Sequence, residues 1–405
     1  MKVAVINSGS SSIKYEVFDT GALAMIASGL IEKIGGPDGL IRQRRRKADG
    51  TFDELRASKP LPDHRAGFEL MESVNRRDPL LGDGTELLGI GHRVVHGGER
   101  FREPALINDE VIAAIRGLIP LAPLHNPSNI LGIEVMRERF PRVPQVAVFD
   151  TAFHQTLPPA AYRYAVPQDL YEKHQVRKYG FHGSSHGYVA KEASRHLGVP
   201  LTAANLIILH LGNGASAAAI KDGRSVDTSL GMTPLEGLIM GTRCGDLDPS
   251  IPFYLMRRTG MKPDEVESLL NRESGLKGIC GVSDMREIQE RAANGDGQAA
   301  LAIEMFCYRI KKYIGAYHAV LGKLDALVFT GGIGENSAPI RQRVCDGLAH
   351  IGIDVDPVRN AAAKGNVAEI QRDGMPVKVL VVRTNEEREI ALQTISAIEK
   401  AKARP

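Results

Sequence analysis

The sequence predicts an α/β protein made of two similar halves. Three observations lead to this prediction: a pattern of strand, glycine-rich turn and strand that occurs in both halves, an alternation of strand-like runs with helix-start signals, and a length of 405 residues. A domain usually holds about 100–200 residues, so a chain of this length has room for two or three.

The repeated pattern is found once in each half of the chain. Residues 2–18 read as a strand (KVAVI), a polar turn (NSGSSS) and a second strand (IKYEVF). Residues 206–220 repeat that order with LIILHL, GNGAS and AAAI, and a third apolar run at 326–329 leads into TGGIGENS. Turns of this kind point several backbone N–H groups to one concave side, where they bind anions. The repeat therefore predicts two halves that face each other across a cleft.

The stretches between these turns supply the other elements. We expect strands at 145–149, ending at Asp150, and at 377–382. Helix-start signals alternate with the strands, which is typical of α/β folds. The expected helix starts are Asn126-Pro127, Asp248-Pro249, Ser184 or Ser185 for a helix that runs to Leu197, and a capping box of Thr384 and Glu387.

Composition excludes several classes of protein. Apolar residues make up 43% and charged residues 24%, as in ordinary globular proteins. The net charge of +3 is too small for a dedicated nucleic-acid or membrane-surface binder, and no apolar run reaches the roughly 18 residues of a membrane helix. Four cysteines without C-x-x-C spacing suit a reducing cytosol. We interpret the basic run at 42–47 as a solvated edge strand or hairpin.

The first turn carries groups suited to phosphate. Asn7 ends the first strand, and serine hydroxyls and Lys14 follow it in NSGSSSIK. An asparagine alone is most often a turn residue, but hydroxyls and backbone amides ahead of a lysine suit phosphate oxygens. The order of residues matches neither a Walker loop nor a dinucleotide fingerprint, and we expect the glycine turns to lead into strands and not into helices.

Two arginines lie in glycine-flanked loops, Arg93 in GHRVVHGGE and Arg243 in GTRCGDLDP. A buried arginine needs an anionic partner, so each is either half of a structural ion pair or a ligand for a small anion. Because there are two of them beside phosphate turns, a carboxylate or phosphoryl ligand is the better interpretation for both.

Three further side chains are candidates for chemistry. His182 lies just ahead of a predicted helix, where it either packs and caps or meets phosphate. Asp150 follows a strand, where open α/β sheets place their ligands, although aspartate is also a common cap. Glu386 has no capping task, unlike its neighbour Glu387, and is the candidate ligand for a hydrated magnesium ion.

Eight segments together resemble the acetate kinase family and run in order from Val3 to Glu387. They are VAVINSGSSSIK, GHRVVHGGE, VAVFDTAFHQTLP, YGFHGSSH, ILHLGNGAS, DTSLGMTPLEGLIMGTRCGDLDP, VFTGGIGENS and RTNEE. The resemblance implies the superfamily of acetate and sugar kinases, heat-shock chaperones and actin, with two duplicated ribonuclease H-like domains facing a nucleotide cleft. The implied domains are residues 1–150 with the C-terminal helix 386–405, and residues 151–385.

The resemblance also implies a role for each candidate. Asp150, His182 and Arg243 would be catalytic, and Asn7 and Glu386 would hold Mg²⁺, with Mn²⁺ as an alternative. The substrate carboxylate would meet Arg93 in a pocket completed by Val95, Leu124, Phe181 and Pro234. ATP or ADP would be held by Lys14, His210, Leu211, Gly212, Asn213, Gly214, Asp284, Met285, Arg286, Gly331, Gly332, Ile333, Gly334, Glu335 and Asn336.

The implied reaction is reversible transfer of a phosphoryl group from ATP to acetate, giving ADP and acetyl phosphate. A carboxylate is already deprotonated, so it needs positive charge and positioning and not a general base. The family resemblance further implies a cytoplasmic homodimer that acts on small molecules alone, with no nucleic-acid or membrane partner.

Two other functions compete with this one. The first is a kinase for propionate or another short-chain acid, because one methylene in an apolar pocket is worth only about 1–3 kcal/mol. The second is a nucleotide-driven clamp of the chaperone or actin type, which has no use for a small-carboxylate site built from Arg93, His182 and Arg243. Cys244 stands where the family pattern has serine, which suggests that activity is sensitive to thiol reagents.

Overall fold

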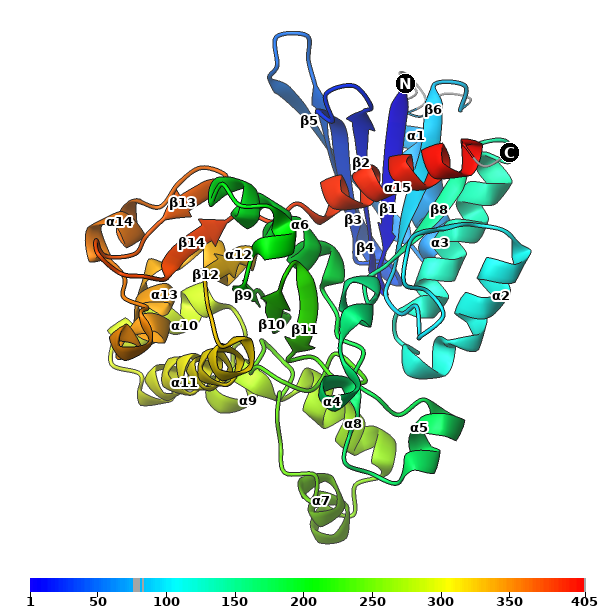
Figure 1. Cartoon of the computed structure of the whole chain (residues 1–405). Helices are drawn as coiled ribbons and strands as arrows, with labels where there is room; N and C mark the ends of the chain where they lie inside the picture. The colour runs from blue at the N-terminus through cyan, green and yellow to red at the C-terminus, as the bar shows by residue number, and fades with distance from the viewer. Residues whose placement is uncertain (76–80, 82–83, 404–405) are drawn as a thin grey trace. The chain divides into compact units, whose positions relative to one another are not determined.

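The computed structural model describes residues 1–75, 81 and 84–403, and it contains two compact units (Figure 1). The first unit comprises Met1–Ala152 and Asn385–Pro405, and the second comprises Phe153–Thr384. Each unit is built around one β-sheet and is described separately below.

The first unit holds an eight-stranded sheet in the order β5-β4-β3-β2-β1-β6-β8-β7. Strand β1 lies near its middle, antiparallel to β2 and parallel to β6. The strands are β1 (Lys2–Ser8), β2 (Ser12–Asp19), β3 (Met25–Glu32), β4 (Gly36–Arg46), β5 (Phe52–Leu61), β6 (Leu87–Val94), β7 (Ala105–Leu106) and β8 (Gln145–Phe149). The helices are α1 (His64–Asn75), α2 (Asp109–Gly117), α3 (Asn126–Arg139) and α15 (Glu386–Lys402).

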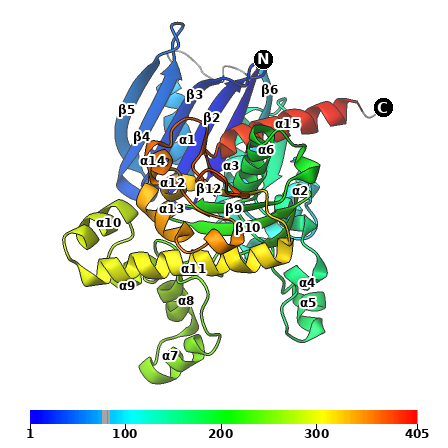
Figure 2. The same cartoon turned by 60° about the vertical axis from the view of Figure 1, so that its left-hand side comes forward.

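Side-chain alternation along β1 explains why helices cover both faces of this sheet. Ala4 and Ile6 belong to a core shared with α1 and α3, whereas Val3 and Val5 pack with apolar residues of α15. Figures 1 and 2 both show α15 running across the sheet. The C-terminal helix is thereby fixed to the first unit, with its N-terminal residue Glu386 near the carboxyl ends of the parallel strands.

The second unit holds a six-stranded sheet in the order β11-β10-β9-β12-β14-β13. Helix α6 packs against one face through an apolar core with β9 and β10, and the long helix α11 also packs against β9 and β10 (Figure 2). The strands are β9 (Leu206–Leu211), β10 (Ala215–Lys221), β11 (Arg224–Thr228), β12 (Ala326–Thr330), β13 (Val367–Glu369) and β14 (Lys378–Val382).

The helices of the second unit lie mainly between β11 and β12 and after β12. They are α4 (Pro159–Tyr162), α5 (Gln168–His174), α6 (Gly183–His196), α7 (Ile251–Thr259), α8 (Pro263–Arg272), α9 (Gly275–Cys280), α10 (Met285–Ala293), α11 (Gly297–Leu321), α12 (Gly331–Asn336), α13 (Ala338–Cys345) and α14 (Pro357–Ala362).

The internal repeat predicted from the sequence is confirmed, because β1–β2 and β9–β10 are both antiparallel hairpins closed by a polar turn. The expectation that all the glycine turns lead into strands is wrong for the third turn, where β12 runs into helix α12. Gly331 sits at this switch with φ +75°, and a Cβ there would lie 2.8 Å from the backbone oxygen of Leu211. Glycine therefore allows the chain to turn sharply beside β9 before the helix begins.

All four expected helix caps are wrong. Helix α3 begins at Asn126 itself, and His125 occupies its N-cap position. Helix α6 begins after His182, which has no side-chain capping bond, so neither Ser184 nor Ser185 is its N-cap. Helix α7 begins at Ile251, three residues after Asp248, because Ser250 occupies its N-cap position. The last helix is capped by Asn385, which accepts a hydrogen bond from the backbone N–H of Arg388. A short polar side chain just before a helix is a cap only when its φ and ψ allow it, and sequence does not show this.

The basic run is part of the predicted hairpin but does not form an edge strand. It lies on β4, which is paired with β3 on one side and with β5 on the other. Opposite charges face each other across the β4–β5 hairpin, with Arg44 opposite Glu54 and Arg45 opposite Asp53. Within the part of the chain that the structure describes, every helix is too short or too polar to span a lipid bilayer.

Candidate active site

Two neighbouring parallel strands bring Arg93 and Asp150 together in the first unit. Arg93 lies one residue before the end of β6, and Asp150 directly follows β8, which is paired with β6. The Arg93 Nη2 atom lies 2.9 Å from the Asp150 Oδ2 atom, and its Nε lies 3.9 Å from an Oε atom of Glu386. The Asp150 side chain is only 1% exposed and that of Arg93 is 17% exposed. The carboxyl ends of the parallel strands β6 and β8 thus carry a partly buried guanidinium between two carboxylates.

Neighbouring charges in this cluster shift the pKa values of Arg93 and Glu386. Burial disfavours the charged form of Arg93, but the carboxylates of Asp150 and Glu386 outweigh it and raise its pKa above the ordinary value. Burial, with the nearby charges of Asp150 and Glu387, raises the pKa of Glu386 to about 7 although Arg93 opposes this. A divalent cation would relieve this crowding of carboxylates, and carboxylate oxygens are the ligands that Mg²⁺ prefers.

The first hairpin lies beside this cluster. Asn7 on β1 is half-buried and is opposite Lys14 on β2. The Lys14 Nζ atom lies 2.7 Å from Glu387 and 3.5 Å from Glu16. Burial and the charge of Glu387 raise the pKa of Glu16 to about 7. Glu387 therefore pairs with a lysine, and the capping task that its sequence position suggested belongs to Asn385.

The residues present in the first unit fit a hydrated divalent ion. Asn7 offers an amide oxygen and Glu386 a carboxylate, so few protein oxygens are available and water or phosphate would complete the shell. Among the residues that the structure describes, no group of three or more histidine, cysteine, aspartate or glutamate side chains forms an all-protein metal cage.

His182 and Arg243 meet in the second unit, on the turn between β9 and β10. A Cβ added to Gly214 would lie 2.8 Å from Arg243 Nη2 and 3.4 Å from His182 Nε2. His182 has a left-handed backbone with φ 56°, an uncommon conformation for a residue with a side chain, and it aims the ring back over the hairpin turn. The guanidinium of Arg243 and the imidazole of His182 therefore both lie close to the backbone of Gly214, which has no side chain.

Arg243 differs from Arg93 in having no carboxylate partner among the described residues. Its Nη1 atom donates to the backbone oxygen of Pro234 at 2.6 Å, and burial lowers its pKa below the ordinary value. A buried guanidinium without a negative partner is unfavourable on its own and favours the binding of an anion.

A cavity of about 600 Å³ lies near Gly214 in the second unit. It is formed where β9 ends and where α10 and α12 begin. It is lined by Gly212, Asn213, Ser283, Asp284, Met285, Arg286, Gln289, Gly332, Ile333, Asn336 and Ser337. Eight residues of the predicted nucleotide site line this cavity. Three lining residues were not predicted, namely Ser283, Gln289 and Ser337. Ser283 and Gln289 flank the predicted Asp284–Arg286 segment, so the start of α10 was the signal that could have found them.

Other members of the predicted nucleotide set lie outside the wall of this cavity. Lys14 belongs to the first unit, where it pairs with Glu387. Glu335 accepts hydrogen bonds from the backbone N–H groups of Gly331 at 3.1 Å and Thr384 at 3.0 Å, so its carboxylate holds the loop together. The remaining five are His210 and Leu211 at the end of β9, Gly214 in the turn that follows, Gly331 at its close approach to Leu211, and Gly334 in α12.

The four residues predicted to surround an apolar substrate group are divided between the units. Val95 and Leu124 belong to the first unit, where Val95 is buried and Leu124 is 48% exposed. Phe181 and Pro234 belong to the second, where Phe181 is buried and Pro234 accepts the hydrogen bond from Arg243. Asn129 fixes the backbone of Val95 by accepting its N–H at 3.0 Å.

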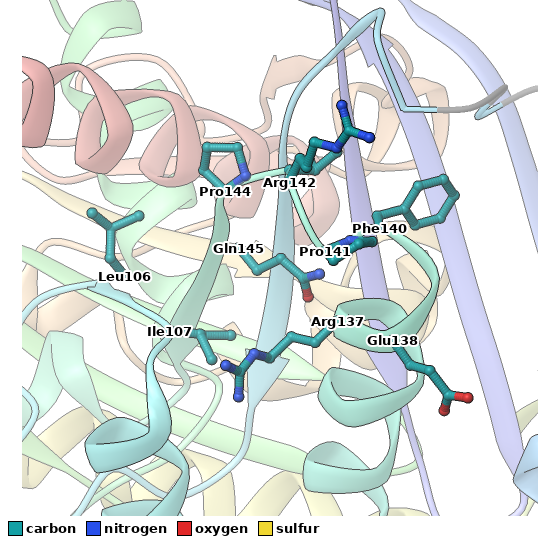
Figure 3. A pocket seen from close by; sticks show the side chains of 10 residues that line it. Leu106, Ile107, Arg137, Glu138, Phe140, Pro141, Arg142, Pro144 and Gln145 are labelled. Carbon is teal, nitrogen blue, oxygen red and sulfur yellow. The ribbon is translucent and has the colours of Figure 1, made fainter.

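Another cavity, of about 580 Å³, lies in the first unit (Figure 3). Its wall is formed by the end of α3, the following loop and the residues next to β7, and it contains none of the predicted site residues. The residues that line it are Leu106, Ile107, Arg137, Glu138, Phe140, Pro141, Arg142, Val143, Pro144 and Gln145.

Cys244 is half-buried beside Arg243 and lines a cavity of about 540 Å³. Burial raises the pKa of its thiol, which reduces the thiolate fraction at neutral pH. We expect iodoacetamide to modify Cys244 at least about tenfold more slowly in the native protein than in the unfolded chain, and the modified protein to lose activity because the added group crowds the Arg243 loop. Peptide mass spectrometry alongside activity measures both. Full activity after complete alkylation of Cys244 would disprove the thiol sensitivity.

Comparison with known proteins gives matches over the whole chain. A family model described as the Acetokinase family matches residues 2–392. An acetate kinase of Syntrophobacter fumaroxidans is 57% identical over 403 residues, covering 99% of this chain and 98% of that protein. An acetate kinase of Nitratidesulfovibrio vulgaris is 50% identical over 400 residues, covering 98% of this chain and 100% of that protein.

Solved structures agree with these matches. An acetate kinase of Porphyromonas gingivalis superposes with a TM-score of 0.91 at 44% identity, covering 98% of this chain and 99% of that one. A propionate kinase of Francisella tularensis superposes with a TM-score of 0.90 at 42% identity, covering 97% and 98%. The predicted α/β fold with two sheets is confirmed.

Proposed function

This chain belongs to the acetokinase family, and we propose that it catalyses reversible transfer of the γ-phosphoryl group of ATP to acetate, giving ADP and acetyl phosphate. Within the structure, the main support for this proposal is that Arg243 and His182 both lie next to Gly214. Arg243 is partly buried there without a carboxylate partner among the described residues, next to the Gly212–Asn213 wall of a nucleotide-sized cavity.

We assign the first unit the task of binding the acetate carboxylate and the metal. Arg93 offers its guanidinium to the carboxylate, and Asp150 holds that guanidinium in place through the 2.9 Å ion pair. Asp150 is thus an orienting group and not a base towards acetate, which is already ionised. Asn7 and Glu386 would hold Mg²⁺, or Mn²⁺ in its place. When bound, the ion supplies positive charge to the phosphate oxygens.

The second unit would hold the nucleotide and the transferring group. The cavity behind Gly212 and Gly332 receives the nucleotide, and the turn at Gly214 lets phosphate approach the backbone closely. Arg243 and His182 then meet the equatorial oxygens of the γ-phosphoryl group. Two anions repel each other as the carboxylate attacks, so positive charge and hydrogen-bond donors at this point lower the barrier.

The acid substrate is the finer part of the proposal. The similarity to acetate kinases at up to 57% identity favours acetate, whereas the propionate kinase of Francisella tularensis is 42% identical. Because a single methylene is worth only about 1–3 kcal/mol in an apolar pocket, we expect overlapping use of short acids with acetate preferred. We further propose a cytoplasmic homodimer, supported by the family and by a row of exposed apolar side chains at helical spacing on α11, Leu301, Met305 and Tyr308.

An assay of ADP release tests this function directly. Mg-ATP is supplied with acetate, propionate or butyrate in turn, and hydroxylamine traps the acyl phosphate as a hydroxamate. We expect acetate-dependent hydroxamate, with kcat/KM falling as the acid lengthens. A maximum at propionate would assign the chain to propionate, and ADP release without any acid dependence would favour the nucleotide-driven clamp.

A further inference from the structure

We propose that Ser216 and His186 position His182 as a neutral imidazole that carries its proton on Nε2 and donates it to the transferring phosphoryl group. The proposal rests on the proposed function, because that function places His182 against the phosphoryl group. Ser216 and His186 act through the His182 ring, which faces Gly214 where the reacting atoms would lie, and they are therefore positioning residues.

A single buried hydroxyl links the two histidines. Ser216 Oγ lies 2.9 Å from His182 Nδ1 and 2.8 Å from His186 Nε2. Ser216 lies on β10 and His186 on the first turns of α6, and both side chains are fully buried. His182 and His186 are four residues apart, which places their rings on the same side of the helix start, facing the strand.

The Ser216 hydroxyl has only one proton to donate, and this limits how protons can be arranged along the hydrogen bonds from His182 through Ser216 to His186. If His186 donates from Nε2 to the serine oxygen, the serine proton is free to donate to His182 Nδ1. A neutral His182 then carries its own proton on Nε2, the nitrogen that faces Gly214 beside Arg243. In this arrangement the N–H of His186 and the O–H of Ser216 each have an acceptor.

The reverse arrangement leaves a buried donor without an acceptor. If His182 donated from Nδ1, the serine would either donate to His186 Nε2, which moves the proton of His186 to Nδ1, or accept from both rings, which leaves its own O–H without an acceptor among the described residues. The Nδ1 atom of His186 is buried and has no hydrogen-bond partner among the described residues. A buried N–H without a partner loses the free energy of hydration with no compensation, so this tautomer is disfavoured. Because a cationic His182 also carries a proton on Nδ1, the same penalty opposes the imidazolium.

The surroundings also oppose a positive charge on these rings. Burial, followed by the neighbouring His154 and His210, lowers the pKa of His186 well below its ordinary value. The His182 and His210 ring centroids are 4.4 Å apart, and Arg243 approaches the same turn from the other side. Ser185 of α6 and Thr384 after β14 add only hydroxyls next to His210. Of these two side chains, Arg243 brings a full positive charge, and His182 adds a hydrogen-bond donor.

Nitrogen NMR of the wild-type protein tests the tautomer without any turnover. In ¹⁵N-histidine-labelled protein, the His182 signals are assigned by their loss in His182→Gln. We expect an Nε2–H tautomer that persists from pH 6 to 8, across the ordinary histidine pKa of about 6.5. An Nδ1–H tautomer, or an imidazolium in this range, would overturn the proposal. Since this readout needs no acetate-dependent activity, it separates failure of the positioning from failure of the proposed function.

Kinetics of serine variants provide the second test. Ser216→Ala should lower kcat about tenfold with an unchanged KM for ATP, and should introduce a histidine titration into the pH profile of kcat, because His182 is then free to change tautomer and to charge. Ser216→Thr keeps the hydroxyl and should restore both. Ser225→Ala is the matched control, since Ser225 is equally buried and contacts His154 at 2.8 Å without touching His182. A Ser216→Ala protein with the wild-type kcat and pH profile would refute the positioning. If Ser216→Ala does not fold, the tautomer measured by NMR in the wild-type protein provides the test together with the kinetics of Ser216→Thr.

Discussion

Replacing Arg243 with alanine is expected to lower kcat by about 10³-fold or more while the protein stays folded. Arg243 is partly buried, and no described carboxylate pairs with it, so its positive charge is available to an anionic ligand although one N–H group bonds to the backbone oxygen of Pro234. Under the proposed function, that charge meets the oxygens of the γ-phosphoryl group as negative charge spreads over them. Arginines in this role are worth about 10³–10⁵ in rate. Steady-state kinetics with saturating acetate and Mg-ATP measure the effect.

The stability of the Arg243 variant distinguishes this role from a structural one. Removing an unpaired, partly buried charge relieves a desolvation cost, so the thermal midpoint of Arg243→Ala should equal or exceed that of the wild type. Arg257→Ala is a control, because this exposed arginine of α7 lies in the same unit and carries no proposed role. Turnover within about threefold of the wild type in Arg243→Ala would contradict the assignment, and so would a large loss of stability with activity retained.

Replacing Arg93 with alanine is expected to lower kcat/KM for acetate by about 10³-fold and also to destabilise the protein. The first effect follows from the proposed contact of Arg93 with the acetate carboxylate, and the second follows from its ion pair with Asp150, whose side chain is 1% exposed. Breaking a buried ion pair by removing one partner leaves an uncompensated charge and typically costs about 3–5 kcal/mol. Because Arg93 is itself partly exposed, we expect a value near the lower end, measured by chemical denaturation.

A double variant separates the two roles of Arg93. Arg93→Ala combined with Asp150→Asn removes both charges of the pair, so it should recover most of the lost stability. It should not recover activity, because no guanidinium remains to hold the acetate carboxylate. If the double variant regained substantial acetate-dependent turnover, Arg93 would be half of a structural ion pair and no more, which is the alternative that its sequence left open.

Local sequence patterns predicted the two hairpins and the strand that carry most of the site. The two hairpins were visible because a strand, a glycine-rich turn and a strand follow one another directly, so that Asn7 faces Lys14 and His210 faces Ser216 in register. The strand that ends at Asp150 was visible from its apolar run. These features depend on neighbours in the chain, and hydrophobic periodicity and turn chemistry reveal such neighbours.

The contacts between distant segments could not be predicted in the same way. Glu387 looked like a capping residue, but Lys14, which is far away in the sequence, takes its carboxylate. Glu335 lay in a predicted nucleotide motif, but two backbone N–H groups take its carboxylate. The link from His182 through Ser216 to His186 requires the packing of α6 against β10. Spacing along one sequence does not determine which side chains meet across a sheet or between a helix and a strand.

The proposed function requires that a carboxylate oxygen of acetate attack the γ-phosphorus of ATP, and oxygen labelling shows whether it does. Acetate labelled with ¹⁸O in both carboxylate oxygens is incubated with the protein and unlabelled Mg-ATP, and the acetyl phosphate is trapped with hydroxylamine. Hydroxylamine attacks the acyl carbon and releases phosphate together with the bridging oxygen. We predict phosphate that contains one ¹⁸O atom for each hydroxamate formed. Phosphate without ¹⁸O would show that the bridging oxygen came from ATP, and it would contradict the proposed function.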